Sequence, residues 1–186
     1  MSVQDHSLAS ALTRAERIHD RAALEAAIAR MGRDIGDALA GECAVFLTVM
    51  NGGMFFAASL AFAIDGDLEF DYVHATRYGD AITGRELHWL RRPQARLAER
   101  TVILADDILD EGYTLAALRE HCVTEGAKRV LIATLCVKKH ARRVPGLAAD
   151  FAGVEVPDRY VFGYGLDYFG QGRNLTAIHA LPEGET

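Results

Sequence analysis

Three continuous apolar runs lie in the middle of this 186-residue chain and restrict its fold more than any other feature. They extend over Cys43–Met50, Val102–Ala105 and Val130–Val137. Apolar runs without polar alternation are typical of strands that are buried on both faces of a parallel sheet. Helical patterns separate these runs along the chain. The sequence therefore predicts an α/β fold with a mostly parallel sheet flanked by helices.

The segments between the runs show helical periodicity or the polar character of loops. We expect one or two helices over about 14–40, helices over 54–64 and 114–124, further strands over 69–75, 86–90 and 160–163, and a polar loop over 76–85. Gly126 lies just after one predicted helix, where helices commonly end in a left-handed residue. In sheets of this kind, ligands bind beyond the carboxyl ends of the strands.

Composition excludes several classes of protein. Half of the residues are hydrophobic and a quarter are charged, as in soluble globular domains. The net charge of −6 argues against a nucleic-acid partner that is held by overall positive charge. No apolar run approaches the ~18 residues of a membrane span, and the first ten residues lack the apolar core of a signal peptide. The three cysteines show no CxxC spacing, so we expect a cytoplasmic protein without a membrane partner.

The run from Thr101 to Leu118 carries the strongest chemical signal. An apolar strand leads into two adjacent acids, and a third acid, a glycine and a hydroxyl follow before a helix begins. These polar positions and the glycine are Asp106, Asp107, Asp110, Gly112 and Thr114. Backbone N–H groups at a helix N-terminus hold anions, and carboxylates at a strand end accept hydrogen bonds from sugar hydroxyls. The pattern predicts a site for a phosphate beside polyhydroxyl groups.

This stretch resembles the phosphoribosyl-pyrophosphate (PRPP) motif of the purine phosphoribosyltransferases. In that motif, four apolar residues, two acids and two apolar residues precede Asp-Thr-Gly-x-Thr. Glu111 departs from it, since the family usually has a small hydroxyl residue there; we expect its backbone N–H to donate while its side chain turns outward. Val156–Tyr168 resembles the family's C-terminal signature, which an arginine, here Arg173, follows.

Three weaker similarities occur in the order that the family shows. Asn51-Gly52-Gly53 resembles the pyrophosphate-binding loop, with Asn51 in place of a common lysine. Thr76-Arg77-Tyr78-Gly79 resembles a loop that closes over the site, although taken alone it reads nearly as well as an ordinary surface loop. Lys138 follows a buried strand where a family lysine donates to the exocyclic oxygen of a 6-oxopurine.

The resemblance implies a hypoxanthine-guanine phosphoribosyltransferase with Mg²⁺ as its cofactor. It implies Asp110 as the catalytic general base and Asp106, Asp107 and Asp167 as magnesium ligands. Tyr160 would stack on the purine, Val161 would read the edge of the base through its backbone, and Arg173 would bind pyrophosphate. The substrate-binding residues would be Asn51, Gly52, Arg77, Tyr78, Asp106, Asp107, Glu111, Gly112, Tyr113, Thr114, Lys138, Tyr160, Val161, Asp167 and Arg173.

The same resemblance implies a type I phosphoribosyltransferase fold in a single domain over 1–186. Its core would span about 36–160, and the N- and C-terminal segments would build a small hood. A homodimer or homotetramer is expected. Two alternatives remain: a xanthine-preferring enzyme, or a non-catalytic nucleotide-sensing regulator, against which the acidic charge and Asp110 argue. Lys138 argues against adenine because an ammonium group only donates. The seven histidines form no ligand spacing and receive no role.

Overall fold

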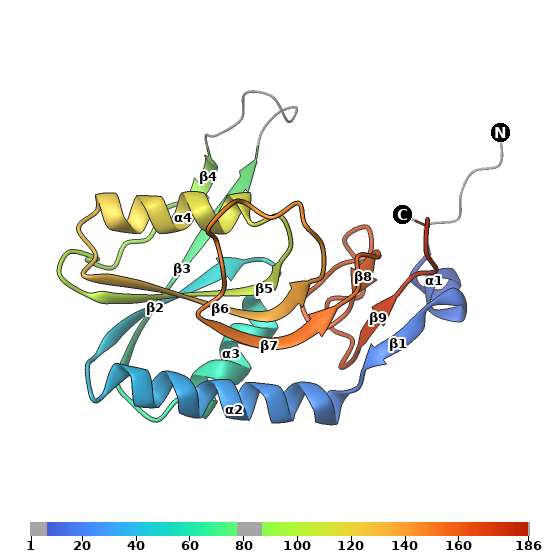
Figure 1. The fold of residues 1–186 in the computed structure, drawn as a ribbon, viewed down its shortest axis with the longest axis horizontal. Coiled ribbons are helices and arrows are strands. Elements are labelled where there is room, and N and C mark those ends of the chain that lie inside the picture. The colour runs from blue at the N-terminus through green and yellow to red at the C-terminus, as the bar shows by residue number, and fades with distance from the viewer. Residues whose placement is uncertain (1–6, 78–86, 186) are drawn as a thin grey trace.

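The computed structural model describes residues 7–77 and 87–185, in which four helices and nine strands occur (Figure 1). The helices are α1 (Leu8–Arg14), α2 (Arg21–Leu39), α3 (Met54–Ala63) and α4 (Tyr113–Thr124). The strands are β1 (Glu16–His19), β2 (Ala44–Met50), β3 (Leu68–Arg77), β4 (Leu87–Arg91), β5 (Thr101–Leu109), β6 (Arg129–Lys138), β7 (Phe151–Val156), β8 (Val161–Phe162) and β9 (Ile178–Ala180).

The main sheet has six strands in the order β4-β3-β2-β5-β6-β7. All of its pairings are parallel except the hairpin of β3 with β4. Helices α2 and α3 cover one face and α4 covers the other (Figure 1). The predicted α/β fold with a mostly parallel, helix-flanked sheet is therefore confirmed.

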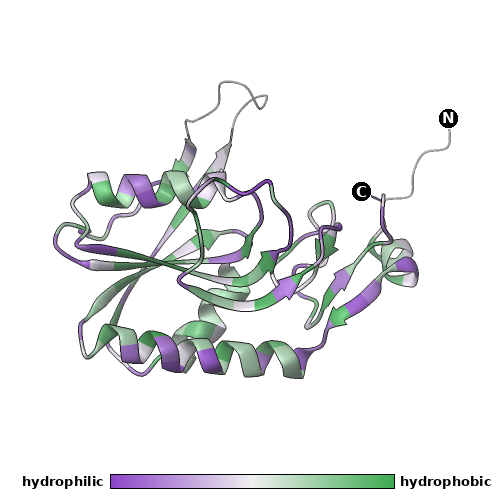
Figure 2. Ribbon diagram, in the orientation of Figure 1, coloured by the Kyte–Doolittle hydropathy of each residue, from purple (hydrophilic) through white to green (hydrophobic). Residues whose placement is uncertain are grey.

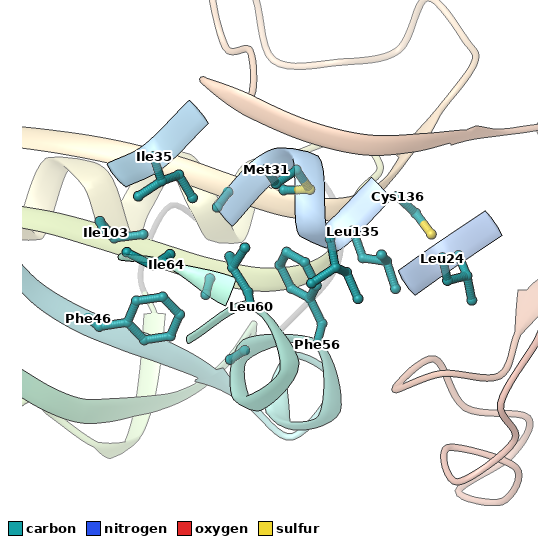
Figure 3. Packing of buried hydrophobic residues seen from close by; sticks show 14 of the residues in the cluster. Leu24, Met31, Ile35, Phe46, Phe56, Leu60, Ile64, Ile103, Leu135 and Cys136 are labelled. Atoms are coloured by element: carbon teal, nitrogen blue, oxygen red, sulfur yellow. The ribbon is translucent and has the colours of Figure 1, made fainter. Parts of the chain in front are cut away.

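The central strands explain the continuous apolar runs, because their side chains alternate between two cores. Phe46 and Ile103 pack with buried residues of α2 and α3 (Figure 3). Val45 and Leu104, one position away, pack with buried residues of α4 on the opposite face. Figure 2 shows hydrophobic residues along these strands, whereas α2 carries both hydrophilic and hydrophobic positions. Because both faces of these strands are buried, the stretches Ala44–Leu47 and Val102–Ala105 carry only apolar side chains.

The predicted helix over 14–40 is wrong at its beginning. Residues Glu16–His19 form β1, and α2 starts at Arg21 after Asp20, whose Oδ1 accepts a hydrogen bond from the Ala23 N–H at 2.9 Å. Strand β1 exists because it pairs with β9 from the other end of the chain. A local helical pattern could not reveal that partner. The remaining predicted helices are confirmed, with α4 followed by Gly126 at φ +81°.

A second sheet, in the order β1-β9-β8, joins the two ends of the chain into a small hood together with α1 (Figure 1). Its apolar core contains Ala11, Phe162, Tyr168 and Leu181. Arg159 ties the hood together by donating to the carbonyl oxygens of Ala180 and Leu181 and by pairing with Glu16 at 2.8 Å. The hood therefore depends on contacts between the terminal segments.

The predicted strands over 69–75, 86–90 and 160–163 correspond to β3, β4 and β8 with shifted ends. Strands β7 and β9 were not predicted. In the part of the chain that the structure describes, no helix has the length and apolarity that a membrane span needs.

Two glycines of α2 provide a test of the packing between α2 and α3. A Cβ atom on Gly32 would lie 2.4 Å from the Ala63 carbonyl oxygen, whereas one on Gly36 would lie 3.1 Å from that of Asp65. Gly32→Ala should lower the free energy of unfolding by about 1–3 kcal/mol through overpacking. Gly36→Ala is the matched control and should lower the free energy of unfolding less than Gly32→Ala does, because its contact is longer while both changes bring the same gain of up to ~1 kcal/mol in helix propensity. Urea unfolding measures both, and equal effects would contradict the packing.

Candidate active site

The two adjacent acids of the motif lie inside β5 rather than at its end. Strand β5 pairs with β6 as far as Leu109, but its pairing with β2 stops at Ala105. The expected strand end at Asp106 is therefore correct on the β2 side only. Asp106 and Asp107 lie where β2 has turned away, beside the loop that follows β2.

That loop, residues 51–53, packs directly on the acids because two of its residues lack side chains. A Cβ on Gly52 would lie 1.9 Å from Asp107 Oδ2, and one on Gly53 would lie 2.6 Å from the Ala105 carbonyl oxygen. Gly165, at φ +105°, approaches from the C-terminal segment, and its Cβ would lie 2.3 Å from the Gly52 carbonyl oxygen. Three stretches of backbone thus meet around one carboxylate.

The adjacent side chains of Asp106 and Asp107 are unfavourable to ionise together, because both are buried and their charges repel. Burial raises the pKa of Asp106 well above its ordinary value, and repulsion from Asp107 raises it further. Burial also raises the pKa of Asp107, although a hydrogen bond with the side chain of Asp106 and the charge of Arg173 act in the opposite direction. The Asp107 N–H donates to Asp106 Oδ1 at 2.9 Å. Two such carboxylates favour a bound cation, because its positive charge would offset both their mutual repulsion and the cost of burying their charge.

The N-terminus of α4 forms the anion side of the site. Its N-cap is Gly112 at φ +85°, and no side-chain hydrogen bond caps the helix. The left-handed backbone at Gly112 favours glycine, and a Cβ there would also lie 2.4 Å from Leu147 Cδ2. The neighbouring Glu111 has its carboxylate 3.8 Å from Arg142 Nε. Helix N–H groups and the helix dipole therefore face a potential phosphate.

A cavity of about 590 Å³ joins these features. Ten of the predicted residues line it: Asn51, Gly52, Asp106, Asp107, Asp110, Glu111, Gly112, Tyr113, Thr114 and Arg173. Lys138, Tyr160, Val161 and Asp167 are not among its lining residues. Arg77 is the last residue of β3, and Tyr78 lies outside the described residues. The structure thus brings the predicted PRPP residues together more completely than the predicted purine residues.

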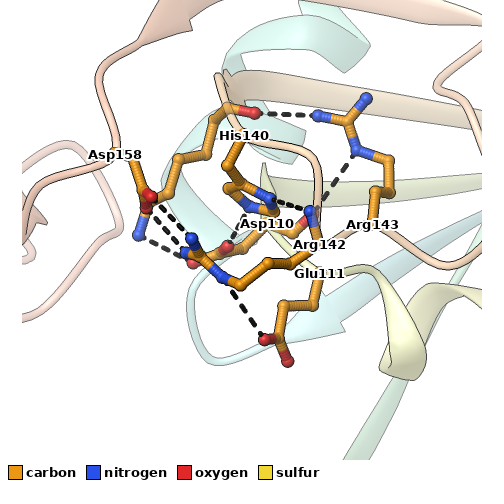
Figure 4. Close-up of polar contacts among 7 residues, drawn as sticks. Asp110, Glu111, His140, Arg142, Arg143 and Asp158 are labelled. Carbon is orange, nitrogen blue, oxygen red and sulfur yellow. Dashed lines mark hydrogen bonds and ion pairs between the residues drawn. The ribbon is translucent and has the colours of Figure 1, made fainter.

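Asp110, the predicted base, is held by two donors (Figure 4). Lys138 Nζ lies 2.7 Å from its Oδ2, and His140 Nε2 lies 2.6 Å from its Oδ1. Burial acts to raise the pKa of Asp110, but hydrogen bonds from Lys138 and His140 outweigh burial, so the pKa lies below its ordinary value. The predicted base and the predicted purine-binding lysine are therefore paired with each other here.

Asp167 and Arg173 also form a pair. Their Oδ1 and NH2 atoms are 2.8 Å apart, and Asp167 Oδ2 accepts from the Gly170 N–H at 2.8 Å. Arg173 also donates to the Gly165 carbonyl oxygen at 2.6 Å. Within 7–77 and 87–185, no group of three or more His, Cys, Asp or Glu side chains is placed to hold a metal.

The aromatic residue predicted to stack on a purine lies in the C-terminal segment. The ring of Tyr160 is nearly parallel to that of Phe169, at 9° and 6.2 Å between centroids. Its hydroxyl donates to the Asp167 carbonyl oxygen at 3.2 Å. Val161 begins β8 and pairs with Ala180 of β9. The stacking role of Tyr160 stays a prediction.

Sequence reasoning missed the contribution of the segment after β6. His140 reaches Asp110, and Arg142 lines the cavity. Arg142 forms a bidentate pair with Asp158 at 2.7 and 2.8 Å. The run of basic residues after Lys138 was the available signal, because cations close to a predicted phosphate site are informative.

Comparison with known proteins agrees with this geometry. The model of the phosphoribosyl transferase domain matches residues 14–168. The hypoxanthine-guanine phosphoribosyltransferase of Bacillus subtilis (strain 168) is 37% identical over 134 residues, which cover 72% of this chain and 74% of that protein. The hypoxanthine phosphoribosyltransferase of Escherichia coli (strain K12) is 31% identical over 160 residues, covering 84% and 89%.

A crystal structure of a hypoxanthine-guanine phosphoribosyltransferase from Bacillus anthracis matches the fold with a TM-score of 0.82. It is 28% identical, and the match covers 89% of this chain and 95% of that chain. Together with the PRPP-type motif around Asp106 and the adjoining cavity, these similarities show that the chain belongs to the phosphoribosyl transferase domain family.

Proposed function

We propose that this chain is a hypoxanthine-guanine phosphoribosyltransferase. It converts hypoxanthine or guanine and PRPP into IMP or GMP and pyrophosphate, and acts in purine salvage. One observation carries the proposal: a single cavity is lined by the acid pair of β5, by Asn51 and Gly52 of the glycine loop, and by the N-terminus of α4, where no side chain of the described residues caps the helix. These are the groups that a pentose carrying phosphate at two ends requires. Relatives that carry this enzymatic name support the choice of substrates.

We propose one orientation for PRPP in this cavity. The 5′-phosphate lies against residues 110–114, which line the cavity and include the start of α4, where helix N–H groups are available to an anion. The pyrophosphate lies against the loop 51–53 and Arg173, whose guanidinium suits phosphate oxygens. The ribose hydroxyls then face Asp106 and Asp107.

Magnesium fits the acid pair. Asp106 and Asp107 offer hard oxygen ligands, and burial raises the pKa of both, so a cation compensates them. Mg²⁺ commonly binds through one or two carboxylates together with substrate phosphates, which agrees with the absence of a three-ligand cluster in the described residues. Asp167, which pairs with Arg173 in the structure, would join these ligands if Arg173 turned from it to the pyrophosphate. When bound, the ion neutralises charge on the leaving pyrophosphate.

The chemistry replaces one bond at C1′ of the ribose by another. As the bond between C1′ and the pyrophosphate oxygen breaks, positive charge develops on the ribose, and the carboxylates of Asp106 and Asp107 stabilise it. A purine ring nitrogen forms the new bond, and the purine proton passes to Asp110. Lys138 donates to the 6-oxo group and Tyr160 stacks on the ring. Lys138 is paired with Asp110 Oδ2 in the structure, and in the proposed reaction it turns from Asp110 to the 6-oxo group, which frees Oδ2 for the purine proton.

Apolar side chains on α3 and β3 support a homodimer or homotetramer. Phe62 and Phe70 are 94% and 62% exposed, and Met54, Phe55 and Tyr72 are also exposed. Exposed apolar groups that gather on neighbouring elements mark interaction surfaces. We place the protein in the cytoplasm, because its three cysteines are all free and two of them are buried.

A base-choice assay tests the proposed function. With PRPP and magnesium, the wild-type protein should form nucleotide from hypoxanthine and guanine but not from adenine, and excess chelator should stop the reaction. Xanthine is tested in the same assay, and faster turnover with xanthine than with hypoxanthine or guanine would identify a xanthine-preferring enzyme instead. In Lys138→Ala, the ratio of activity with hypoxanthine or guanine to activity with adenine should fall by roughly 10-fold or more, because a donor-only group at the 6-position is lost. Lys139→Ala is the control, since this exposed lysine pairs with Glu155. Wild-type use of adenine would show that Lys138 has another role.

The role of Asp110 is tested by Asp110→Asn. Turnover should fall by roughly 10²- to 10⁴-fold, the usual contribution of general acid–base catalysis. PRPP binding, measured by calorimetry, should persist because the phosphate contacts come from the backbone. Asp34→Asn on the exposed side of α2 is the control. Unchanged turnover in Asp110→Asn would remove Asp110 from the mechanism.

Light scattering after gel filtration tests the assembly. Phe70→Glu should shift the protein toward the monomer, because a charge buried in an apolar contact is costly. Val123→Glu, at an exposed apolar position of α4, should leave the mass unchanged. A monomeric wild-type protein would contradict the proposed homodimer or homotetramer.

A further inference from the structure

The carboxylate of Asp110 has a separate partner on each oxygen (Figure 4). His140 Nε2 lies 2.6 Å from Oδ1 and Lys138 Nζ lies 2.7 Å from Oδ2. The side chain of His140 is 3% exposed, whereas that of Asp110 is 38% exposed. We propose that His140 is a positioning residue: its Nε2–H holds the Asp110 carboxylate in place while Lys138 leaves to bind the purine. This inference rests on the proposed function.

The hydrogen bonds of the His140 ring determine its tautomer. The backbone N–H of Arg142 donates to Nδ1 at 3.0 Å. A ring nitrogen that accepts a hydrogen bond carries no proton, so Nε2 bears the hydrogen and donates it to Asp110. While both bonds persist, the ring has no nitrogen free to take a proton from Asp110. His140 therefore orients the base and does not relay its proton.

The segment that carries His140 is fixed at several points. Arg142 holds Asp158 with both terminal guanidinium nitrogens, at 2.7 and 2.8 Å. The N–H of Val144 donates to the carbonyl oxygen of Glu111 at 2.9 Å, which joins the segment to the loop of the base. His140 consequently stays next to that loop without help from the lysine.

The hydrogen bond between His140 and Asp110 matters because Asp110 loses its other partner, Lys138, during the proposed reaction. In the proposed reaction, Lys138 turns to the 6-oxo group, so Oδ2 of Asp110 becomes free to accept the purine proton. Oδ1 keeps its bond to His140, and the carboxylate stays aligned. Without His140, a half-exposed carboxylate would follow Lys138 or turn to solvent. Misplacement of a reacting group by about 1 Å costs up to roughly 10²-fold in rate.

The same bond affects the ionisation of the base. Burial acts to raise the pKa of Asp110, and hydrogen bonds from Lys138 and His140 lower it more. A donor to the charged form favours that form, so removal of His140 should raise the pKa of Asp110. The other charged groups near this cluster are Arg142, Asp158, Glu111 and Arg143, whose guanidinium donates to the carbonyl oxygens of Asp110 and Lys138 at 3.5 and 2.8 Å. None of these residues is substituted in the His140 variants.

The experiment compares His140→Ala with His140→Gln, whose amide N–H can replace the Nε2 donor. His19→Gln is the control, because His19 Nε2 lies 2.8 Å from the Glu155 carbonyl oxygen, away from the site. His140→Ala should lower kcat by about 10- to 100-fold. Its KM for PRPP should stay within about twofold, because no phosphate contact changes. The acidic limb of its pH profile should move to higher pH, and His140→Gln should recover most of kcat.

Two results would overturn the role of His140: equal losses in His140→Ala and His140→Gln, or a pH profile that His140→Ala leaves unchanged. A wild-type protein without transferase activity would refute the proposed function instead. Carbon-13 NMR titration of the Asp110 carboxyl then decides the inference without substrate. The pKa of Asp110 should be higher in His140→Ala than in the wild type and His140→Gln, and equal values in all three would overturn the proposal.

Discussion

The contact between the loop 51–53 and the segment Ala105–Asp107 of β5 is the constraint on which the rest of the site depends. A side chain at Gly52 would overlap the carboxylate of Asp107, and one at Gly53 would overlap the backbone of Ala105. Gly165 meets the same loop from the C-terminal segment. Because these backbones meet without side chains between them, a single ligand can reach loop N–H groups, two carboxylates and the start of α4 at once.

The acids of one motif have opposite electrostatic environments. Burial, and for Asp106 also the neighbouring charge, raises the pKa of Asp106 and Asp107. Donors from Lys138 and His140 lower the pKa of Asp110 in spite of burial. The first environment attracts a cation, and the second keeps a carboxylate ionised until one donor leaves. Titratable groups whose pKa values are pushed apart in this way are suited to different roles in one reaction.

Individual elements show how far the fold could be predicted from sequence. The run Cys43–Met50 predicted β2 because burial on both faces leaves a purely local signal. Asp20 was an available N-cap signal that places the start of α2 correctly. Strand β7 went unpredicted in part because Gly153 interrupts it, and that glycine is needed where a Cβ would lie 2.5 Å from the Leu135 carbonyl oxygen. Strand β9 has three residues and depends on distant partners.

The sequence by itself determined the α/β class, because hydrophobic periodicity distinguishes strands from helices. It also determined the order and spacing of the acids, glycine and hydroxyl in the motif Asp106–Thr114. Only the tertiary structure decided that Asp110 binds Lys138 and His140 and that Asp167 pairs with Arg173. His140 lies 30 positions beyond Asp110 and reaches it only because β5 and β6 run side by side, so that their following loops meet. The partners of a side chain depend on where folding places distant backbone, and no local pattern carries that information.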